Sequence, residues 1–128
     1  MANKTAPKFL NLALIKLPPG GVASIGHRIS GVLMFLSIPA GAWLLDLSLR
    51  GERGFRSALD YLHSPVALLL SVLLVWALGH HLLAGIRHLL LDIGIGLEKR
   101  SARLSARLVN AGGVILALLW ALWLAGLT

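Results

Sequence analysis

Residues 65–92 read PVALLLSVLLVWALGHHLLAGIRHLLLD, and the first 22 of them carry no formal charge. About 20 consecutive apolar residues are enough for a helix to cross the hydrocarbon core of a bilayer. Two further runs have the same character, Ile29–Leu45 and Leu108–Thr128. The sequence therefore predicts an all-α integral membrane protein with three transmembrane helices.

The composition favours a membrane fold over a soluble one. Of the 128 residues, 57% are hydrophobic and 13% are charged, and a soluble domain carries about 25% charged residues. So short a chain cannot bury that much apolar surface in a core of its own. We predict a single membrane-anchor domain over residues 1–128 that forms part of a heteromeric helix bundle. Its predicted segments are a cytoplasmic N-terminal arm (1–21) and helices over about 22–49, 65–94 and 106–127.

The basic residues predict the orientation in the membrane. Nine of the 12 Lys and Arg residues lie before the first apolar run or in and beside the second connection, and three lie in the first connection. The positive-inside rule then places the N-terminus and the second connection in the cytoplasm of a bacterium, or in the mitochondrial matrix. We expect a multi-pass protein of the bacterial inner membrane, with the mitochondrial inner membrane as the alternative. The basic residues flank apolar runs and follow no groove-reading motif, so no nucleic-acid partner is expected.

Cysteine is absent from the sequence. This excludes a disulfide framework, a thiolate metal site and an iron–sulfur cluster held by this chain. The sequence also has no nucleotide-binding or flavin-binding motif.

A first polar cluster stands at the start of the first predicted helix and reads SIGHRISG over residues 24–31. On a helix, Ser24, His27, Arg28 and Gly31 share one face because they are spaced three and four residues apart. The face combines a hydroxyl, an imidazole and a guanidinium, and it suits a polar or anionic group arriving from the membrane. The alternative is that Ser24 caps the helix and Arg28 extends to the headgroups.

A second polar cluster lies in the second predicted helix. His81, Gly85, His88 and Asp92 form one stripe, and His80 and Arg87 share another face about 100° away. Ionisable residues within a span usually face the bundle interior and mark function, although a histidine there can also be a packing residue. A neutral imidazole is a good axial ligand for haem iron.

The surroundings of His81 suit a haem. Gly85 leaves room for a porphyrin edge, and Arg28, Arg87, His27 and His88 lie toward one membrane face, where propionates need cations. His80 and His81 point about 100° apart and cannot sandwich one iron, so a second axial ligand would come from another chain. Zinc suits the pattern less, because adjacent histidines on one helix do not supply three or four converging ligands.

Both clusters resemble known motifs. Ser24–Gly31 resembles the SxxHRxSG motif of the succinate dehydrogenase cytochrome b subunit family, and His81–Asp92 resembles that family's H-x3-G-I-R-H-x3-D signature. The resemblance covers nearly the whole chain. His80 stands where the family often has a tyrosine, and the glycine spacing favours His81 over His80 as the ligand.

The resemblance implies roles for individual residues. His81 is the axial ligand of one haem b, which is shared with a second anchor subunit. His27 and Arg28 approach a haem propionate, with Gly85 and His88 in the haem pocket. Ser24, Arg28 and Ile25 line the ubiquinone site. Arg87 and Asp92 lie near the iron–sulfur subunit, as a subunit contact or part of a proton path.

The resemblance also implies an assembly. A flavoprotein subunit oxidises succinate, an iron–sulfur subunit passes the electrons on, and ubiquinone is reduced in the lipid bilayer. The chain itself is expected to carry no catalytic residue for succinate. Three alternatives remain open: the anchor of a fumarate reductase, a haem-free structural scaffold, and a small transporter subunit.

Overall fold

The computed structural model describes residues 17–127, which form four helices in the order α1 (Pro19–Ser48), α2 (Glu52–Leu62), α3 (Pro65–Asp92) and α4 (Lys99–Leu127). Three of them, α1, α3 and α4, are long and apolar enough to cross a membrane. The predicted all-α membrane architecture is therefore confirmed. The predicted N-terminal arm lies mostly outside the described residues.

Four of the predicted boundaries differ from the structure, including the end of the first helix, which is Ser48 rather than residue 49. The first helix begins at Pro19 rather than residue 22, because a proline fits the first turn of a helix, where its missing N–H is not needed. Ser24 therefore lies inside α1 and does not cap it. The second helix begins at Pro65 as predicted, after Ser64, whose hydroxyl accepts a hydrogen bond from the Ala67 amide at 3.3 Å. It ends at Asp92 rather than residue 94, before Gly94 and its φ of 85°.

The third predicted helix begins seven residues too late. It starts at Lys99 rather than residue 106, so the charged segment before the apolar run is helical as well. Lys, Arg, Ala and Leu, which dominate this segment, are good helix formers. A further helix, α2, is not predicted from the sequence; it is an 11-residue amphipathic helix that begins after Gly51, whose φ is 88°.

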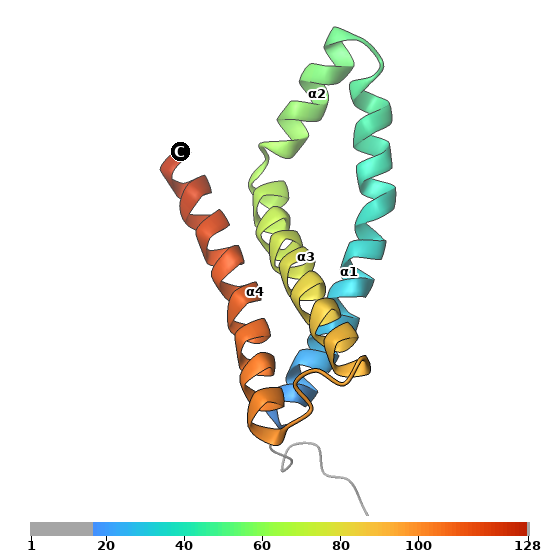
Figure 1. Ribbon diagram of the computed structural model, residues 1–128. Coiled ribbons are helices and arrows are strands. Elements are labelled where there is room, and N and C mark those ends of the chain that lie inside the picture. Colours follow the sequence, from blue (N-terminus) through green and yellow to red (C-terminus); the bar gives the residue numbers. More distant parts are fainter. Residues whose placement is uncertain (1–16, 128) are drawn as a thin grey trace, which may run out of the picture.

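The three long helices converge at the end where α1 and α4 begin and spread apart toward the end that carries α2 (Figure 1). Small side chains permit the close approach: Ala23 of α1, Ala84 of α3 and Ala106 of α4 are each 0% exposed. Small residues at such contacts let transmembrane helices pack closely. The buried part of the bundle, and with it the polar clusters, lies in this convergent half.

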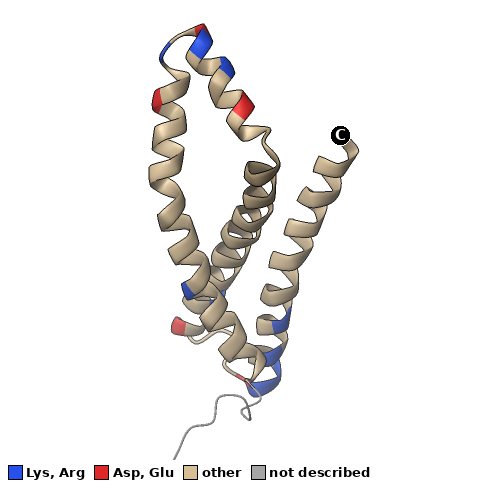
Figure 2. Ribbon diagram, turned by 180° about the vertical axis from the view of Figure 1, so that it is seen from behind, with Lys and Arg blue, Asp and Glu red and all other residues tan. Residues whose placement is uncertain are grey.

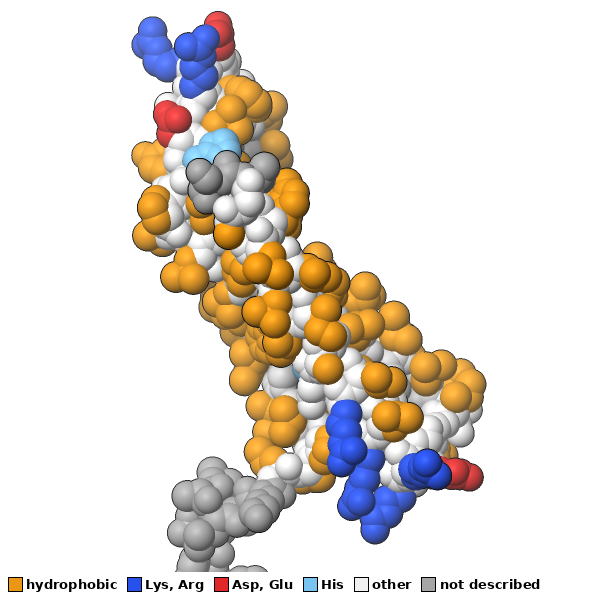
Figure 3. Space-filling model, turned by 90° about the vertical axis from the view of Figure 1, so that its left-hand side faces the viewer, with side chains coloured by type: hydrophobic (Ala, Val, Ile, Leu, Met, Phe, Trp, Pro, Cys, Tyr) orange, Lys and Arg blue, Asp and Glu red, His pale blue; other side chains and the backbone are white. Residues whose placement is uncertain are grey.

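Charged residues lie toward the two ends of the molecule, and the ribbon between them carries none (Figure 2). Between the ends, large apolar side chains cover the outer surface (Figure 3). Phe35, Leu69 and Leu122, for example, are each about 70% exposed. This distribution fits a protein whose middle faces lipid and whose ends reach the headgroups.

Candidate functional site

His81 of α3 contacts α1 at one turn of helix. Its Nδ1 lies 3.1 Å from the carbonyl oxygen of His27 and 3.3 Å from Oγ of Ser30. The Ser30 hydroxyl itself donates to the same carbonyl at 2.9 Å. With the proton on Nδ1, His81 donates to that carbonyl, and its Nε2 keeps a free lone pair. Within residues 17–127, Nε2 makes no hydrogen bond.

An apolar cavity of about 560 Å³ adjoins His81 between α1 and α3. Gly31 stands beside the imidazole, and a side chain there would crowd it, since an added Cβ would lie 3.1 Å from Cε1 of His81. The remaining lining residues are apolar or small: Met34, Phe35, Ser37, Ile38, Leu74 and Leu78. An imidazole held in this way at the edge of an apolar cavity is suited to holding a metal centre that is carried by a flat apolar ligand.

His27 packs on the other side of His81. The two imidazole rings are stacked, with centroids 4.0 Å apart and planes 15° from parallel, and His88 meets His27 edge-on at 5.3 Å. The ring of His27 also lies over Gly85, where an added Cβ would be 3.6 Å from Nε2 of His27. The structure thus brings together His27, His81, Gly85 and His88. The space beside Gly85, which the sequence analysis left for a porphyrin edge, is taken by the imidazole of His27.

His80 has a different environment from its neighbour His81. It is 3% exposed, its Nε2 lies 3.3 Å from the carbonyl oxygen of Ala23, and its ring stacks on Trp76. Gly26 and Gly113 hold it from α1 and α4, since a Cβ at Gly113 would lie 2.9 Å from the His80 Cβ. His80 therefore packs where the three long helices meet and does not line the cavity beside His81.

In the described part of the chain, no side-chain hydrogen bond joins Ser24 or Arg28 to the histidine cluster. Ile25 is 44% exposed and Arg28 is exposed as well, whereas His27 and Gly31 both contact His81. The four residues predicted to share a face of α1 thus have different surroundings: His27 and Gly31 contact His81, and Arg28 is exposed. The Arg28 guanidinium is left accessible to a group outside this chain.

Arg87 is a buried cation near the convergent end of the bundle. It is 9% exposed, and it donates from Nε to Oγ of Ser105 at 3.1 Å and from its terminal amino group to the carbonyl oxygen of Ala102 at 3.2 Å. Asp92, by contrast, is exposed at the end of α3 and forms no ion pair among residues 17–127. Arg87 therefore ties α3 to α4.

Several residues that support this site are not predicted from the sequence. Ser30 lies three residues after His27 inside the quoted motif, and that spacing was the available signal. Asn110 is the lone amide in the third apolar run, and its Nδ2 donates to the carbonyl oxygen of Pro19 at 3.3 Å. Ser105 carries no signal in the sequence, because its partner Arg87 is 18 residues away. No group of three or more His, Cys, Asp or Glu side chains in residues 17–127 is placed to hold a metal ion together.

Comparison with known proteins gives independent evidence about this chain. The family described as succinate dehydrogenase/fumarate reductase transmembrane subunit matches residues 2–125. The chain is similar to the succinate dehydrogenase cytochrome b556 subunits of Paracoccus denitrificans, at 35% identity over 88% of this chain and 87% of the relative, and of Coxiella burnetii, at 36% over 95% and 98%. It is also 32% identical to the succinate dehydrogenase hydrophobic membrane anchor subunit of Halobacterium salinarum, over 74% of each chain.

Proposed function

Because this chain belongs to the family of succinate dehydrogenase and fumarate reductase transmembrane subunits, we propose that it is the cytochrome b anchor of a succinate dehydrogenase, where it binds haem b and forms part of the ubiquinone-reduction site. The observation that carries the proposal is the state of His81. Its Nδ1 is tied to the His27 carbonyl, its Nε2 makes no hydrogen bond within residues 17–127, and the residue lines an apolar cavity.

The residues present fit a haem. An imidazole whose Nδ1–H donates to a backbone carbonyl has a fixed tautomer and orientation, which is the usual arrangement of a metal-binding histidine. When bound, the haem supplies a site that accepts one electron at a time. In the proposal, His81 would hold the iron, with Gly31 leaving space beside its imidazole. Gly85, whose space the ring of His27 occupies, would border the same pocket. His27, Arg28 and His88 would supply polar or cationic groups to the propionates.

A second ligand for the haem iron would come from a second anchor subunit. His80 cannot supply it, because it is adjacent to His81 and its Nε2 lies against the carbonyl of Ala23. The proposed assembly therefore contains a flavoprotein subunit, an iron–sulfur subunit and a second membrane anchor. The Arg87 guanidinium is hydrogen-bonded to Ser105 and Ala102 of this chain. We therefore propose the exposed Asp92 as the subunit contact or proton carrier at this end.

Ubiquinone reduction requires two electrons and two protons, and the chain's own residues stabilise the charge that develops. Ser24 donates a hydrogen bond to a quinone carbonyl oxygen, and Arg28 stabilises the negative charge that appears there as electrons arrive. Ile25, which is 44% exposed, provides an apolar wall. The exposure of Arg28 supports this role, because its guanidinium is not engaged by a carboxylate among residues 17–127.

The three long apolar helices and the bacterial relatives indicate a bacterial membrane protein. We place the N-terminus and the connection between α3 and α4 in the cytoplasm. The exposed basic side chains of Lys99, Arg100, Arg103 and Arg107 at that end support this orientation.

The test is a reduced-minus-oxidised visible spectrum of the purified complex. Wild type should show a b-type signal, and His81→Ala should lose it or alter it clearly. His63→Ala is the matched control, because His63 is an exposed histidine at the opposite end. A colourless wild-type complex would favour the haem-free scaffold, and a signal unchanged in His81→Ala would move the ligand to another residue or chain.

A further inference from the structure

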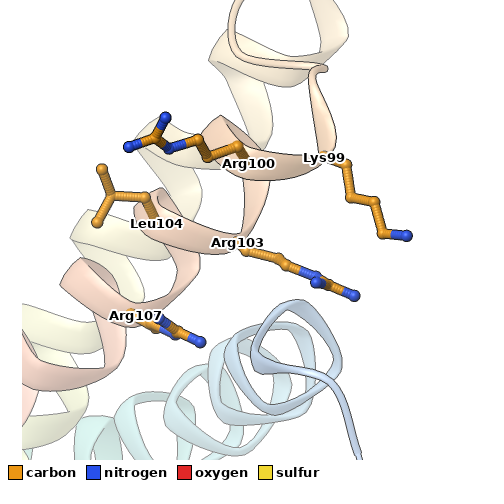
Figure 4. Close-up of a pocket in the computed structure, with 5 residues that line it drawn as sticks. All are labelled: Lys99, Arg100, Arg103, Leu104 and Arg107. Atoms are coloured by element: carbon orange, nitrogen blue, oxygen red, sulfur yellow. The ribbon is translucent and has the colours of Figure 1, made fainter.

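The beginning of α4 carries four cations that the proposed function does not use. Lys99, Arg100, Arg103 and Arg107 line a hollow of about 610 Å³ together with Leu104. Lys99, Arg103 and Arg107 extend to one side of the helix and Arg100 and Leu104 to the other (Figure 4). None of the four forms an ion pair among residues 17–127, and all four are exposed. The hollow thus offers several positive charges to one anionic group.

The depth of these cations in the membrane indicates what that group is. The uncharged part of α4, from Leu108 to Leu127, is 20 residues long, which matches the hydrocarbon core of a bilayer. The nine residues before it rise about 13 Å along the helix axis. The headgroup layer is about 5–7 Å deep on each side of the core. Arg103 and Arg107 therefore lie at the level of the lipid phosphates, and Lys99 and Arg100 lie at the outer edge of that layer.

The apolar surface beside the cations has the form of a lipid tail site. Leu104 and Leu108 follow Arg100 at intervals of one turn, and they are 56% and 63% exposed. Leu118 and Leu122, further along α4, are 57% and 69% exposed. A cationic hollow that continues into an exposed apolar helix face complements a molecule with an anionic head and long apolar chains.

The cationic segment is held in place from the opposite side. Arg87 of α3 binds the carbonyl of Ala102 and the hydroxyl of Ser105, and Asn110 binds the carbonyl of Pro19 in α1. These contacts fix the rotation of α4, which leaves Lys99, Arg103 and Arg107 exposed on one side of the helix and Arg100 exposed on the other (Figure 4). Figure 3 shows Lys and Arg side chains gathered at this end of the molecule.

We propose that the hollow formed by Lys99, Arg100, Arg103 and Arg107 binds the phosphate headgroup of an anionic phospholipid, whose acyl chains lie along Leu104 and Leu108. The site belongs to the membrane leaflet that the convergent end of the bundle reaches. It is separate from the cavity beside His81, because the two share no lining residue. The proposal therefore stands whether or not the chain binds haem.

The test uses the purified complex in nanodiscs of phosphatidylcholine with a minor fraction of phosphatidylglycerol. Native mass spectrometry counts the phosphatidylglycerol molecules that stay bound. Wild type should retain at least one, and Arg103→Gln/Arg107→Gln should bind it about thirtyfold more weakly, since each basic residue near the surface contributes about fivefold. Arg103→Lys/Arg107→Lys keeps both charges and should retain most of the binding.

Arg53→Gln is the matched control, because Arg53 is an exposed arginine of α2 at the opposite end and forms no ion pair among the described residues. It should bind phosphatidylglycerol as wild type does. Equal retention by the double glutamine variant would overturn the proposal. Displacement of the lipid by millimolar inorganic phosphate would also overturn it, by showing a free-phosphate site. Loss of the soluble subunits with unchanged lipid binding would instead identify a protein-docking surface.

Discussion

The imidazole rings of His27 and His81 stack face to face across the α1–α3 contact, with centroids 4.0 Å apart. The carbonyl oxygen of His27 also accepts from Nδ1 of His81, so one residue contacts the imidazole through both its backbone and its side chain. Ser30, one turn later, adds its hydroxyl to the same carbonyl. The orientation of His81 is thus set by a short segment of α1.

Replacing Ser30 by alanine tests that arrangement. Ser30 is 0% exposed and its hydroxyl lies between the His27 carbonyl and His81, so its loss should lower the stability of the complex by about 1 kcal/mol. The thermal unfolding midpoint of the purified complex measures the change. Ser37→Ala is the control, because Ser37 makes the same bond to a carbonyl three residues earlier but touches no histidine. Equal effects of the two substitutions would contradict a special role for Ser30.

Gly113→Ala should destabilise the meeting point of the three helices. The added Cβ would lie 2.9 Å from Cβ and 3.3 Å from Cα of His80, and the backbone of α3 cannot easily move away. Overpacking of this kind costs about 1–3 kcal/mol. Thermal unfolding of the complex measures it, with Gly41→Ala as the control, since a Cβ at Gly41 meets nothing within 4 Å. An unchanged thermal unfolding midpoint in Gly113→Ala would show that His80 has more room than its contacts indicate.

Arg87→Lys should weaken the junction between α3 and α4 although it keeps the charge. A lysine ammonium cannot reproduce the two directed bonds of the guanidinium to Ser105 and Ala102. We expect a loss of about 2 kcal/mol, typical of hydrogen bonds from a charged group. Protease cleavage in the connection over residues 93–98 should become faster. Arg53→Lys, at an exposed site, should leave both stability and the cleavage rate unchanged. Wild-type stability and cleavage of Arg87→Lys would contradict the proposed role of Arg87 in joining α3 to α4.

Trp120 and Ser71 join α4 to α3 in the opposite half of the membrane. The indole Nε1 donates to Oγ of Ser71 at 2.8 Å. Trp120→Phe and Ser71→Ala should each destabilise the complex, and a double-mutant cycle on unfolding midpoints should give a coupling of about 0.5–1 kcal/mol. Trp43→Phe with Ser71→Ala is the uncoupled control pair, because the ring contact of Trp43 is with Tyr61. A coupling of zero for Trp120 and Ser71 would rule out the bond.

Substitution of Ser24 and Arg28 tests the proposed ubiquinone site. Arg28→Leu should slow ubiquinone reduction about a hundredfold, as expected when a donor to a developing charge is removed, and Ser24→Ala about tenfold. Succinate oxidation with a soluble artificial acceptor should be unaffected, since that chemistry lies in other subunits. Arg53→Leu and Ser48→Ala, at the far end of the molecule, are the controls. Normal quinone reduction in both Ser24→Ala and Arg28→Leu would refute the assignment.

The transmembrane architecture could be predicted from the sequence because apolar runs of 20 residues leave few alternatives. The short helix α2 could not, since its charged residues resemble a loop and it is stabilised locally, in part by an ion pair between Glu52 and Arg56. The start of α4 was predicted too late for a similar reason. Charged residues before an apolar run are typical of a connection, although the helix propensity of Lys and Arg is high.

The family could be recognised from two motifs, and the family match confirms that recognition. The pairing of the motifs in space could not be derived from spacing alone. Helical periodicity placed His27 and Arg28 on one face, but it could not tell that His27 packs on His81 while Arg28 is exposed. That distinction depends on the rotation of α1 against α3, which the small residues Ala23, Gly26 and Gly31 determine.

The tie between Arg87 and α4 has a consequence for biosynthesis. A ribosome makes Arg87 before it makes Ala102 and Ser105, so the guanidinium has neither of these partners when α3 first leaves the exit tunnel. An unpartnered cation within a span is costly in lipid. Because a connection of only six residues separates the two helices, α3 and α4 are suited to entering the bilayer together as a hairpin. The fourth helix thus completes the insertion of the third.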